Sequence, residues 1–291
     1  MKPLLITGAT GTLGQAFQRI CHIRGLHAVL LDRTLLDIAD AESIRQALGR
    51  HQPWAVVNAA GYVRVDDAET DQDRCYRENT TGPRLLAEAC AAQGVQLLTF
   101  SSDLVFDGQQ VTPYLEEAVA QPLNVYGHSK LLAEKAVLAH LPSALVVRTS
   151  AFFSAWDEHN FVYHALAAAR QGEPFEAADD LVVSPTYVPD LVNVSLDLLL
   201  DGAHGLWHLA NEGAYTWAEL ARLALRLAGI EEASVVPRPA ASFGWAAERP
   251  RYSVLGSAHG ALLPTVENAL LRYLAEEQLL QAEREPALVV A

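Results

Sequence analysis

A tyrosine and a lysine four positions apart carry the clearest chemistry in this sequence. Tyr126 and Lys130 enclose the segment Tyr-Gly-His-Ser-Lys, and in a helix this spacing places both side chains on one face. A free tyrosine has a pKa of about 10, so we expect a neighbouring ammonium to lower the pKa of the phenol. Such a phenol can donate a proton to a carbonyl oxygen while hydride reaches the carbon.

Ser102 offers a hydroxyl group that could act on the same carbonyl. It follows an apolar run at 95–100 that predicts a strand. Ligands of open α/β sheets bind at the carboxyl ends of the strands, which is where this serine lies. Together with Tyr126 and Lys130, Ser102 completes a predicted catalytic set of serine, tyrosine and lysine.

A glycine-rich turn near the N-terminus predicts a phosphate-binding site. The segment Gly8-Ala-Thr-Gly-Thr-Leu-Gly14 follows a short apolar run and opens an amphipathic stretch. Glycines so placed permit a tight turn, a close approach of the backbone to a pyrophosphate, and close packing of helix on strand. The helix N-terminus then holds the anion through its N–H groups and its dipole. The residues expected to contact the cofactor here are Gly8, Thr10, Gly11, Thr12, Leu13 and Gly14.

Further cofactor contacts are expected at the ends of the next two strands. Asp32 favours a ribose 2′-hydroxyl, whereas Arg33 favours a 2′-phosphate, so the pair leaves both NAD and NADP open. Asn58, Ala59 and Ala60 end the third predicted strand, where small residues let the backbone pass close to a cofactor.

The first half of the chain alternates short apolar runs with amphipathic stretches, and these elements must position the residues above. Strands are expected near residues 4–7, 27–31, 54–57, 95–100 and 144–148. Helices are expected between them, near residues 12–24, 41–49, 81–93 and 125–139. The alternation predicts an α/β fold in which residues 1–150 form a Rossmann-type NAD(P)-binding domain with a doubly wound parallel sheet.

The second half is less regular and predicts a smaller C-terminal α/β region. Residues 151–291 are expected to be mainly substrate-binding, although residues 189–209 should return to the main sheet. A strand is expected at 206–209, and helices near 160–171, after Pro189, at 217–228 and from Pro264 to Glu283. The final residues, from Pro286 onward, are expected to form a loose tail.

Composition and charge exclude several classes of partner. The formal net charge of −14, without any Lys/Arg cluster, excludes DNA and RNA as main partners. No apolar run reaches the roughly 18 residues of a membrane span. Cys21, Cys75 and Cys90 show no disulfide or metal spacing, and no leader segment is visible, so we expect a cytoplasmic protein. His204 and His208 lie in a strand pattern, which favours a surface position over a metal site.

Nine ordered blocks resemble the dTDP-4-dehydrorhamnose reductase family, the RmlD-like sugar-nucleotide reductases of the extended short-chain dehydrogenase/reductase superfamily. The resemblance covers nearly the whole chain. Its blocks are 8–14, 36–38, 58–69, 101–108, 125–130, 148–150, 160–162, 184–191 and 249–255.

This resemblance implies NAD(P)H-dependent reduction of the 4-keto group of a dTDP-activated deoxysugar, as in dTDP-rhamnose biosynthesis. It implies that Asp37 and Ile38 face the adenine, that Ala59, Ala60 and Tyr62 line the cofactor groove, and that Ser102, Tyr126 and Lys130 are catalytic. The substrate contacts that it implies are Ser102, Asp103, Val105, Phe106, Tyr126, Ala151, Arg249 and Tyr252.

The chain also departs from the family's usual residues. Members usually carry Trp where Ala151 stands and Asn where Tyr252 stands. Some family dimers are bridged by a metal through a glutamate, but Ala16 occupies that position, so we expect no metal and either a monomer or a homodimer. Two other functions stay open: an epimerase or dehydratase that retains NAD, and a non-catalytic regulatory subunit.

Overall fold

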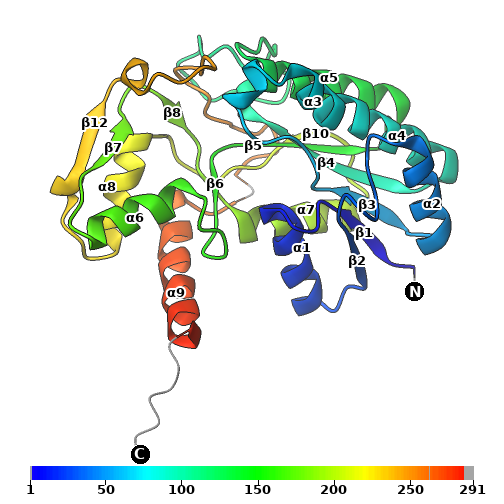
Figure 1. Cartoon of the computed structure of the whole chain (residues 1–291), viewed down its shortest axis with the longest axis horizontal. Helices are drawn as coiled ribbons and strands as arrows, with labels where there is room; N and C mark the ends of the chain where they lie inside the picture. Colours follow the sequence, from blue (N-terminus) through cyan, green and yellow to red (C-terminus); the bar gives the residue numbers. More distant parts are fainter. Residues whose placement is uncertain (1, 262, 285–291) are drawn as a thin grey trace, which may run out of the picture.

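A six-stranded parallel sheet forms the centre of the computed structural model, which describes residues 2–261 and 263–284 (Figure 1). Within these residues the strand order is β10-β5-β4-β3-β1-β2. The strands are β1 (Leu4–Thr7), β2 (Ala28–Leu31), β3 (Ala55–Asn58), β4 (Gln96–Ser102), β5 (Leu145–Thr149) and β10 (Gly205–His208). The order reverses between β1 and β3, and ligands of doubly wound sheets bind at such a reversal. The predicted Rossmann-type α/β class is confirmed.

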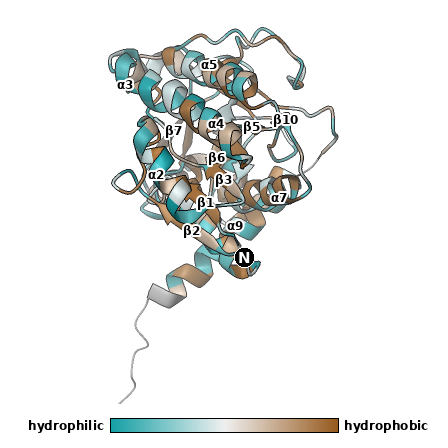
Figure 2. Cartoon of the chain, turned by 90° about the vertical axis from the view of Figure 1, so that its right-hand side faces the viewer, coloured by the Kyte–Doolittle hydropathy of each residue, from teal (hydrophilic) through white to brown (hydrophobic). Residues whose placement is uncertain are grey.

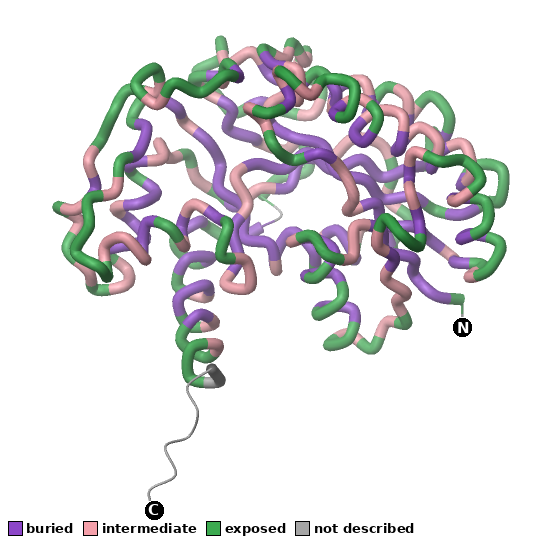
Figure 3. Tube along the Cα trace, viewed as in Figure 1, coloured by how far each residue is buried: buried purple, intermediate pink, exposed green. Residues whose placement is uncertain are grey.

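Helices cover both faces of the sheet (Figures 1 and 2). One face is covered by α1 (Thr12–Ile23) and α7 (Val188–Leu200), and the other by α2 (Ala41–His51), α4 (Gly82–Gln93) and α5 (Val125–His140). The inner strands β1, β3 and β5 are buried and predominantly hydrophobic (Figures 2 and 3). The sequence of a strand that is covered on both faces is a nearly continuous run of apolar residues. This explains why the main sheet was predictable.

The start of α5 positions the predicted tyrosine. Asn124 caps this helix, because its side chain accepts a 2.7 Å hydrogen bond from the Gly127 backbone N–H. A Cβ atom on Gly127 would lie 2.0 Å from the Leu104 carbonyl oxygen, so only glycine permits this close packing. Tyr126 is thereby held in the first turn of α5, beside the 3₁₀ turn at Asp103–Val105 that follows β4.

A second hydrophobic core lies under the C-terminal region. It is formed by α6 (Phe161–Arg170), α8 (Trp217–Leu227) and α9 (Val266–Arg284) together with short strands. The strand pairs are β6 (Phe152–Phe153) with β9 (Thr186–Tyr187), β7 (Phe175–Ala178) with β12 (Val235–Arg238), and β8 (Val182–Val183) with β11 (Tyr215–Thr216). Several of these strands have two residues, too few for an alternating pattern to reveal them.

One helical segment lies outside the predicted elements, whereas the predicted closing helix is present. Helix α3 (Gln72–Tyr76) continues through a wide π-helical turn, Arg77–Thr81, directly into α4. The closing helix α9 extends away from the body of the molecule (Figure 1), and Arg170 of α6 anchors it through hydrogen bonds of 2.8 and 2.6 Å to Glu277. Within the described ranges, no helix has the length and apolar composition that crossing a bilayer requires. The expected tail from Pro286 lies outside them.

Candidate active site

The glycine turn between β1 and α1 is closely packed against the end of β3. Gly8 has a φ of +69°, and a Cβ atom there would lie 2.6 Å from the Ala59 carbonyl oxygen. A Cβ atom on Gly14 would lie 2.1 Å from the Gly8 carbonyl oxygen. Only glycine fits both positions. No side chain caps the start of α1, so the N–H groups of its first turn can bind an anion.

A crevice of about 800 Å³ opens beside this turn and crosses the carboxyl ends of β1, β2 and β3. Most of the predicted cofactor residues line it: Gly8, Thr10, Gly11, Thr12, Leu13, Asp32, Arg33, Asp37, Ile38, Asn58, Ala59, Ala60, Tyr126 and Lys130. Their number and position support the prediction that a dinucleotide binds here.

Two predicted cofactor residues lie outside the lining of this crevice. Gly14 packs behind the turn against Gly8. Tyr62 turns away into a small buried cluster with Ala68 and Cys75, and its backbone N–H donates to Asn79 Oδ1 at 2.8 Å. This backbone bond holds the chain so that the ring faces the protein core.

A carboxylate from the second half of the chain reaches the phosphate turn. Asp157 lines the crevice, and its Oδ2 accepts a 2.6 Å hydrogen bond from Thr12 Oγ1. His159, from the same loop, also lines the crevice. Asp157 lies 145 positions after Thr12, and no local sequence motif identifies either Asp157 or His159 as part of this site.

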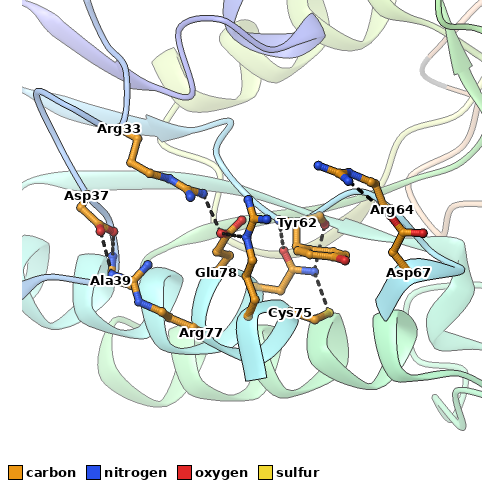
Figure 4. Close-up of polar contacts among 11 residues, drawn as sticks. Arg33, Asp37, Ala39, Tyr62, Arg64, Asp67, Cys75, Arg77 and Glu78 are labelled. Atoms are coloured by element: carbon orange, nitrogen blue, oxygen red, sulfur yellow. Dashed lines mark hydrogen bonds and ion pairs between the residues drawn. The ribbon is translucent and has the colours of Figure 1, made fainter. Parts of the chain in front are cut away.

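The crevice end near β2 contains a network of arginines and acids (Figure 4). Arg33 and Arg74 both contact Glu78 Oε1, at 2.7 and 2.8 Å, and Glu78 is buried. Arg77 lies 2.7 Å from Asp37 and forms a separate ion pair. Glu78 lines the crevice but was not predicted, because it lies in the π-helical turn, which has no distinctive sequence pattern.

The carboxylate of Asp32 is hydrogen-bonded to residues of the turn that follows it. Its Oδ1 accepts hydrogen bonds from Thr34 N at 2.9 Å, Thr34 Oγ1 at 2.6 Å and Leu35 N at 3.2 Å. These bonds, led by that from the Thr34 side chain, lower the pKa of the Asp32 carboxyl. Arg33, in contrast, extends its side chain along the crevice toward Glu78 (Figure 4).

Tyr126 lies where the crevice meets a second cavity, of about 480 Å³, because it lines both. Lys130 follows one turn later on α5, with its Nζ 5.7 Å from the centre of the Tyr126 ring. That Nζ donates a 3.3 Å hydrogen bond to the Phe100 carbonyl oxygen. Burial lowers the pKa of Lys130 to about 8.

The expected lowering of the Tyr126 pKa is wrong as a net effect in this structure. Burial raises the pKa of Tyr126, and the nearby Asp103 raises it further, while a hydrogen bond with Ser102 acts in the opposite direction. Lys130 lies over the ring with its Nζ turned toward Phe100, and the net shift is set by burial and by Asp103. A raised pKa keeps the phenol protonated, which is the form that a proton donor requires.

Ser102 and Asp103 form a buried polar cluster beside Tyr126. The hydroxyl of Ser102 is hydrogen-bonded to Asp103 Oδ1 at 3.1 Å and accepts a 3.2 Å hydrogen bond from the Leu104 N–H. The Ser253 hydroxyl donates to Asp103 Oδ2 at 2.6 Å. Burial raises the pKa of Asp103.

The second cavity is lined mainly by apolar and aromatic side chains, and five predicted substrate residues border it. Those five are Ser102, Asp103, Tyr126, Ala151 and Arg249. Ala151 has a φ of +38°, a left-handed conformation that non-glycine residues rarely adopt outside functional sites. Residues that were not predicted include Val65, Phe161, Glu176, Trp217, Phe243 and Trp245. They come from separate parts of the chain, so only the fold brings them together.

Three predicted substrate residues do not line this cavity. The 3₁₀ turn after β4 directs Val105 and Phe106 into a separate apolar cluster, where Phe106 stacks on Tyr114 with ring centres 4.0 Å apart. Tyr252 packs against the same cluster, whereas its neighbour Ser253 lines the cavity. Extended residues alternate in direction, so Ser253 faces the cavity and Tyr252 faces away from it.

Arg249 joins the two halves of the chain across the mouth of the cavity. Its Nη1 donates to Asp66 Oδ1 at 2.9 Å, and its guanidinium lies 4.3 Å from the centre of the Trp245 ring. Among the described residues, no group of three His, Cys, Asp or Glu side chains could hold a metal ion.

Comparison with known proteins identifies the family. The model of the RmlD substrate binding domain matches residues 1–278. A dTDP-4-dehydrorhamnose reductase of Streptomyces griseus is 37% identical over 86% of this chain and 84% of its own length. A dTDP-4-keto-6-deoxy-D-glucose reductase of Streptomyces niveus is 35% identical over 87% of this chain and 88% of its own length.

Solved structures agree with this assignment. The dTDP-4-dehydrorhamnose reductase of Bacillus anthracis, in complex with NADP, has a TM-score of 0.90 and 30% identity, covering 94% of this chain and 99% of that chain. The dTDP-4-dehydrorhamnose reductase of Clostridium acetobutylicum has a TM-score of 0.89 and 30% identity. The match covers 96% of this chain and 99% of that chain. The resemblance inferred from the nine sequence blocks is confirmed, and this chain belongs to the RmlD substrate binding domain family.

Proposed function

We propose that this protein uses NADPH to reduce the 4-keto group of a dTDP-activated 6-deoxysugar. One observation carries the proposal: Tyr126 lies at the junction of the glycine-lined crevice and the second cavity. A cofactor in the first space and a ketone in the second would meet at its hydroxyl group. The reductases of S. griseus and S. niveus support this substrate class.

The residues at the junction divide the chemistry between them. Bound NADPH would supply hydride to the carbonyl carbon. Tyr126 then donates its proton to the keto oxygen, and the Ser102 hydroxyl polarises the same oxygen. The Lys130 ammonium stabilises the phenolate that remains. Ser102, Tyr126 and Lys130 are therefore the proposed catalytic residues.

The second cavity suits a nucleotide sugar. The rings of Phe161 and Trp217 lie 4.7 Å apart, and those of Phe243 and Trp245 stack at 4.8 Å. Such surfaces can pack against a base, and the guanidinium of Arg249 can bind a phosphate. The apolar walls also exclude water from the reacting groups.

The direct test is to mix the protein with NADPH and dTDP-4-keto-6-deoxyglucose, or its rhamnose-pathway epimer, and to follow loss of the near-ultraviolet absorbance of NADPH. We expect oxidation of one NADPH for each 4-hydroxyl group formed. Absence of turnover with both sugars would contradict the proposal. Purified protein that carries stoichiometric NAD and interconverts sugars without net oxidation would support an epimerase or dehydratase instead.

Arg33 is expected to make NADPH the preferred cofactor. Asp32 is engaged by its own turn, whereas the Arg33 side chain lines the crevice. A hydrogen bond to a charged group contributes about 1.5–3 kcal/mol, so Arg33→Ala should weaken NADPH binding by roughly tenfold or more. NADH binding should change by less than about threefold, because NADH lacks the 2′-phosphate that Arg33 would contact. Fluorescence titration of both cofactors checks this, and an equal loss for both would contradict it.

Loss of the Lys130 ammonium is expected to limit activity at alkaline pH. Burial lowers the pKa of Lys130 to about 8, so the ammonium is present below that pH and disappears above it. We expect kcat/KM to fall by about tenfold per pH unit above pH 8. Lys130→Arg, whose side chain stays charged, should have a lower rate but no such fall. A wild-type profile that stays flat to pH 10 would contradict this role.

A further inference from the structure

The loop between β6 and α6 brings a carboxylate to the start of α1, whose own first turn contains no acidic residue. Asp157 Oδ2 accepts a 2.6 Å hydrogen bond from the hydroxyl of Thr12, the first residue of α1. The other carboxylate oxygen, Oδ1, accepts a 2.9 Å hydrogen bond from the His159 backbone N–H. Both oxygens are therefore fixed, one by the cofactor half of the chain and the other by the loop itself.

Trp156 anchors this loop on α1 at a second point. The guanidinium of Arg19 lies 4.8 Å from the centre of the Trp156 ring, about two turns along α1 from Thr12. Trp156 also packs against the hydrophobic core to which α1 contributes. At the other end of the loop, the side chain of Asn160 caps α6. The position of the Asp157 carboxylate is therefore set by the packing of the loop as well as by its bond to Thr12.

The Asp157 carboxylate lies where a bound pyrophosphate also needs to lie. The glycine turn, residues 8–14, contains no Lys or Arg, so the free N–H groups and the helix dipole are its means of holding an anion. An aspartate is negatively charged at neutral pH, and like charges a few ångströms apart repel each other. Asp157 and a pyrophosphate therefore oppose each other at the start of α1.

Resting on the cofactor site and the function proposed above, we propose that Asp157 competes with the cofactor's pyrophosphate for the N-terminus of α1 and so lowers the affinity for reduced and oxidised cofactor alike. When a dinucleotide binds, the carboxylate must either turn away from Thr12 or stay beside the phosphates, and both outcomes weaken binding. A reductase has to release its oxidised cofactor in every turnover, and release often limits the rate. A residue that weakens cofactor binding therefore suits the reduction proposed here.

Asp157→Asn tests the competition, because asparagine keeps an oxygen that can accept from Thr12 but carries no charge. The Kd of NADPH, measured by fluorescence titration, should fall by about five- to tenfold. The Kd of NADH should fall by the same factor, because both cofactors contain the pyrophosphate, and this separates the effect from that of Arg33→Ala. The Kd of NADP⁺, measured by displacement of NADPH, should fall likewise. A Kd of NADPH that stays the same or rises would overturn the proposal.

Asp157→Ala removes the hydrogen bond to Thr12 together with the charge, and it should give two effects of opposite sign. Without cofactor, α1 loses the anion at its N-terminus, so the Tm should fall by about 1–3 °C. The Kd of NADPH should still fall by at least about threefold, because the repulsion is lost as well. Weaker binding of NADPH would show that Asp157 supports the cofactor site, and an unchanged Tm would show that it does not stabilise α1. Either result would overturn the proposal.

Asp201→Asn is the matched control, since it makes the same change at an exposed residue, the C-cap of α7. Helix α7 leads into β10, so Asp201 lies at the amino edge of the sheet, opposite the crevice. Its Kd of NADPH should stay within about twofold of wild type and its Tm within about 1 °C. An equal gain in affinity would assign the effect to net charge and overturn the proposal. A wild-type protein that binds the cofactors but does not reduce the sugar would instead refute the proposed reduction alone.

Discussion

Tyr126→Phe is expected to lower kcat by at least about a hundredfold, the contribution of a well-placed general acid. This loss corresponds to about 2.7 kcal/mol of transition-state stabilisation. The substitution removes only the hydroxyl group, so the ring still packs beside Lys130 and the crevice keeps its shape. The Kd of NADPH should therefore stay within about twofold. Steady-state kinetics and fluorescence titration measure the two quantities separately.

Tyr76→Phe provides the control for that substitution. Its hydroxyl contacts His128 Nδ1 at 2.9 Å near the protein surface, away from both cavities. We expect this variant to keep nearly all of its activity. If Tyr126→Phe retained a third or more of the wild-type kcat, another group would have to donate the proton.

The second large effect is expected from Glu134, which lies one turn after Lys130 on α5. Its oxygens accept hydrogen bonds of 2.8 and 2.7 Å from Arg148, and the two residues are 4% and 3% exposed. Glu134→Ala leaves a buried guanidinium without its counter-ion. The free energy of unfolding should fall by about 3–5 kcal/mol, which is the usual cost of breaking a buried pair. Denaturant unfolding, monitored by fluorescence and circular dichroism, measures this change.

Two matched variants show whether the loss comes from the unpaired charge. The double variant Glu134→Leu, Arg148→Met replaces both partners with apolar side chains and should recover much of the stability. Glu42→Ala removes a partner of Arg45 from an exposed pair on α2 and should change stability far less. If Glu134→Ala were as mild as Glu42→Ala, the buried pair would not be a structural support.

The parts of this site that were predictable depend on local sequence. The glycine turn must follow a strand and open a helix, and a tyrosine and lysine four apart must share a helix face. Both requirements are visible in short segments, so Gly8, Tyr126 and Lys130 lie where the pattern placed them. The buried parallel strands were predictable for the same reason, since each is a continuous apolar run.

The parts that were missed depend on contacts between distant segments. Asp157 reaches Thr12 only because the loop after β6 folds back over the first helix. The direction of the Tyr126 pKa shift depends on burial and on Asp103, which a motif of five residues does not contain. Phe106 was expected at the substrate, but a tight turn directs its side chain into the interior. The residue types in that turn do not predict the direction.

The position of β10 has a consequence for engineering this protein. Its residues 205–208 form the outermost strand beside β5, and α7, just before it, packs against α1. A chain cut at residue 150 would lack β10, so the backbone N–H and C=O groups on that edge of β5 would be unpaired. Such an exposed strand edge promotes pairing with strands of other molecules. Grafting the cofactor half onto a foreign partner would therefore yield an aggregating fragment, and a change of sugar preference is better sought by exchanging individual side chains around the second cavity.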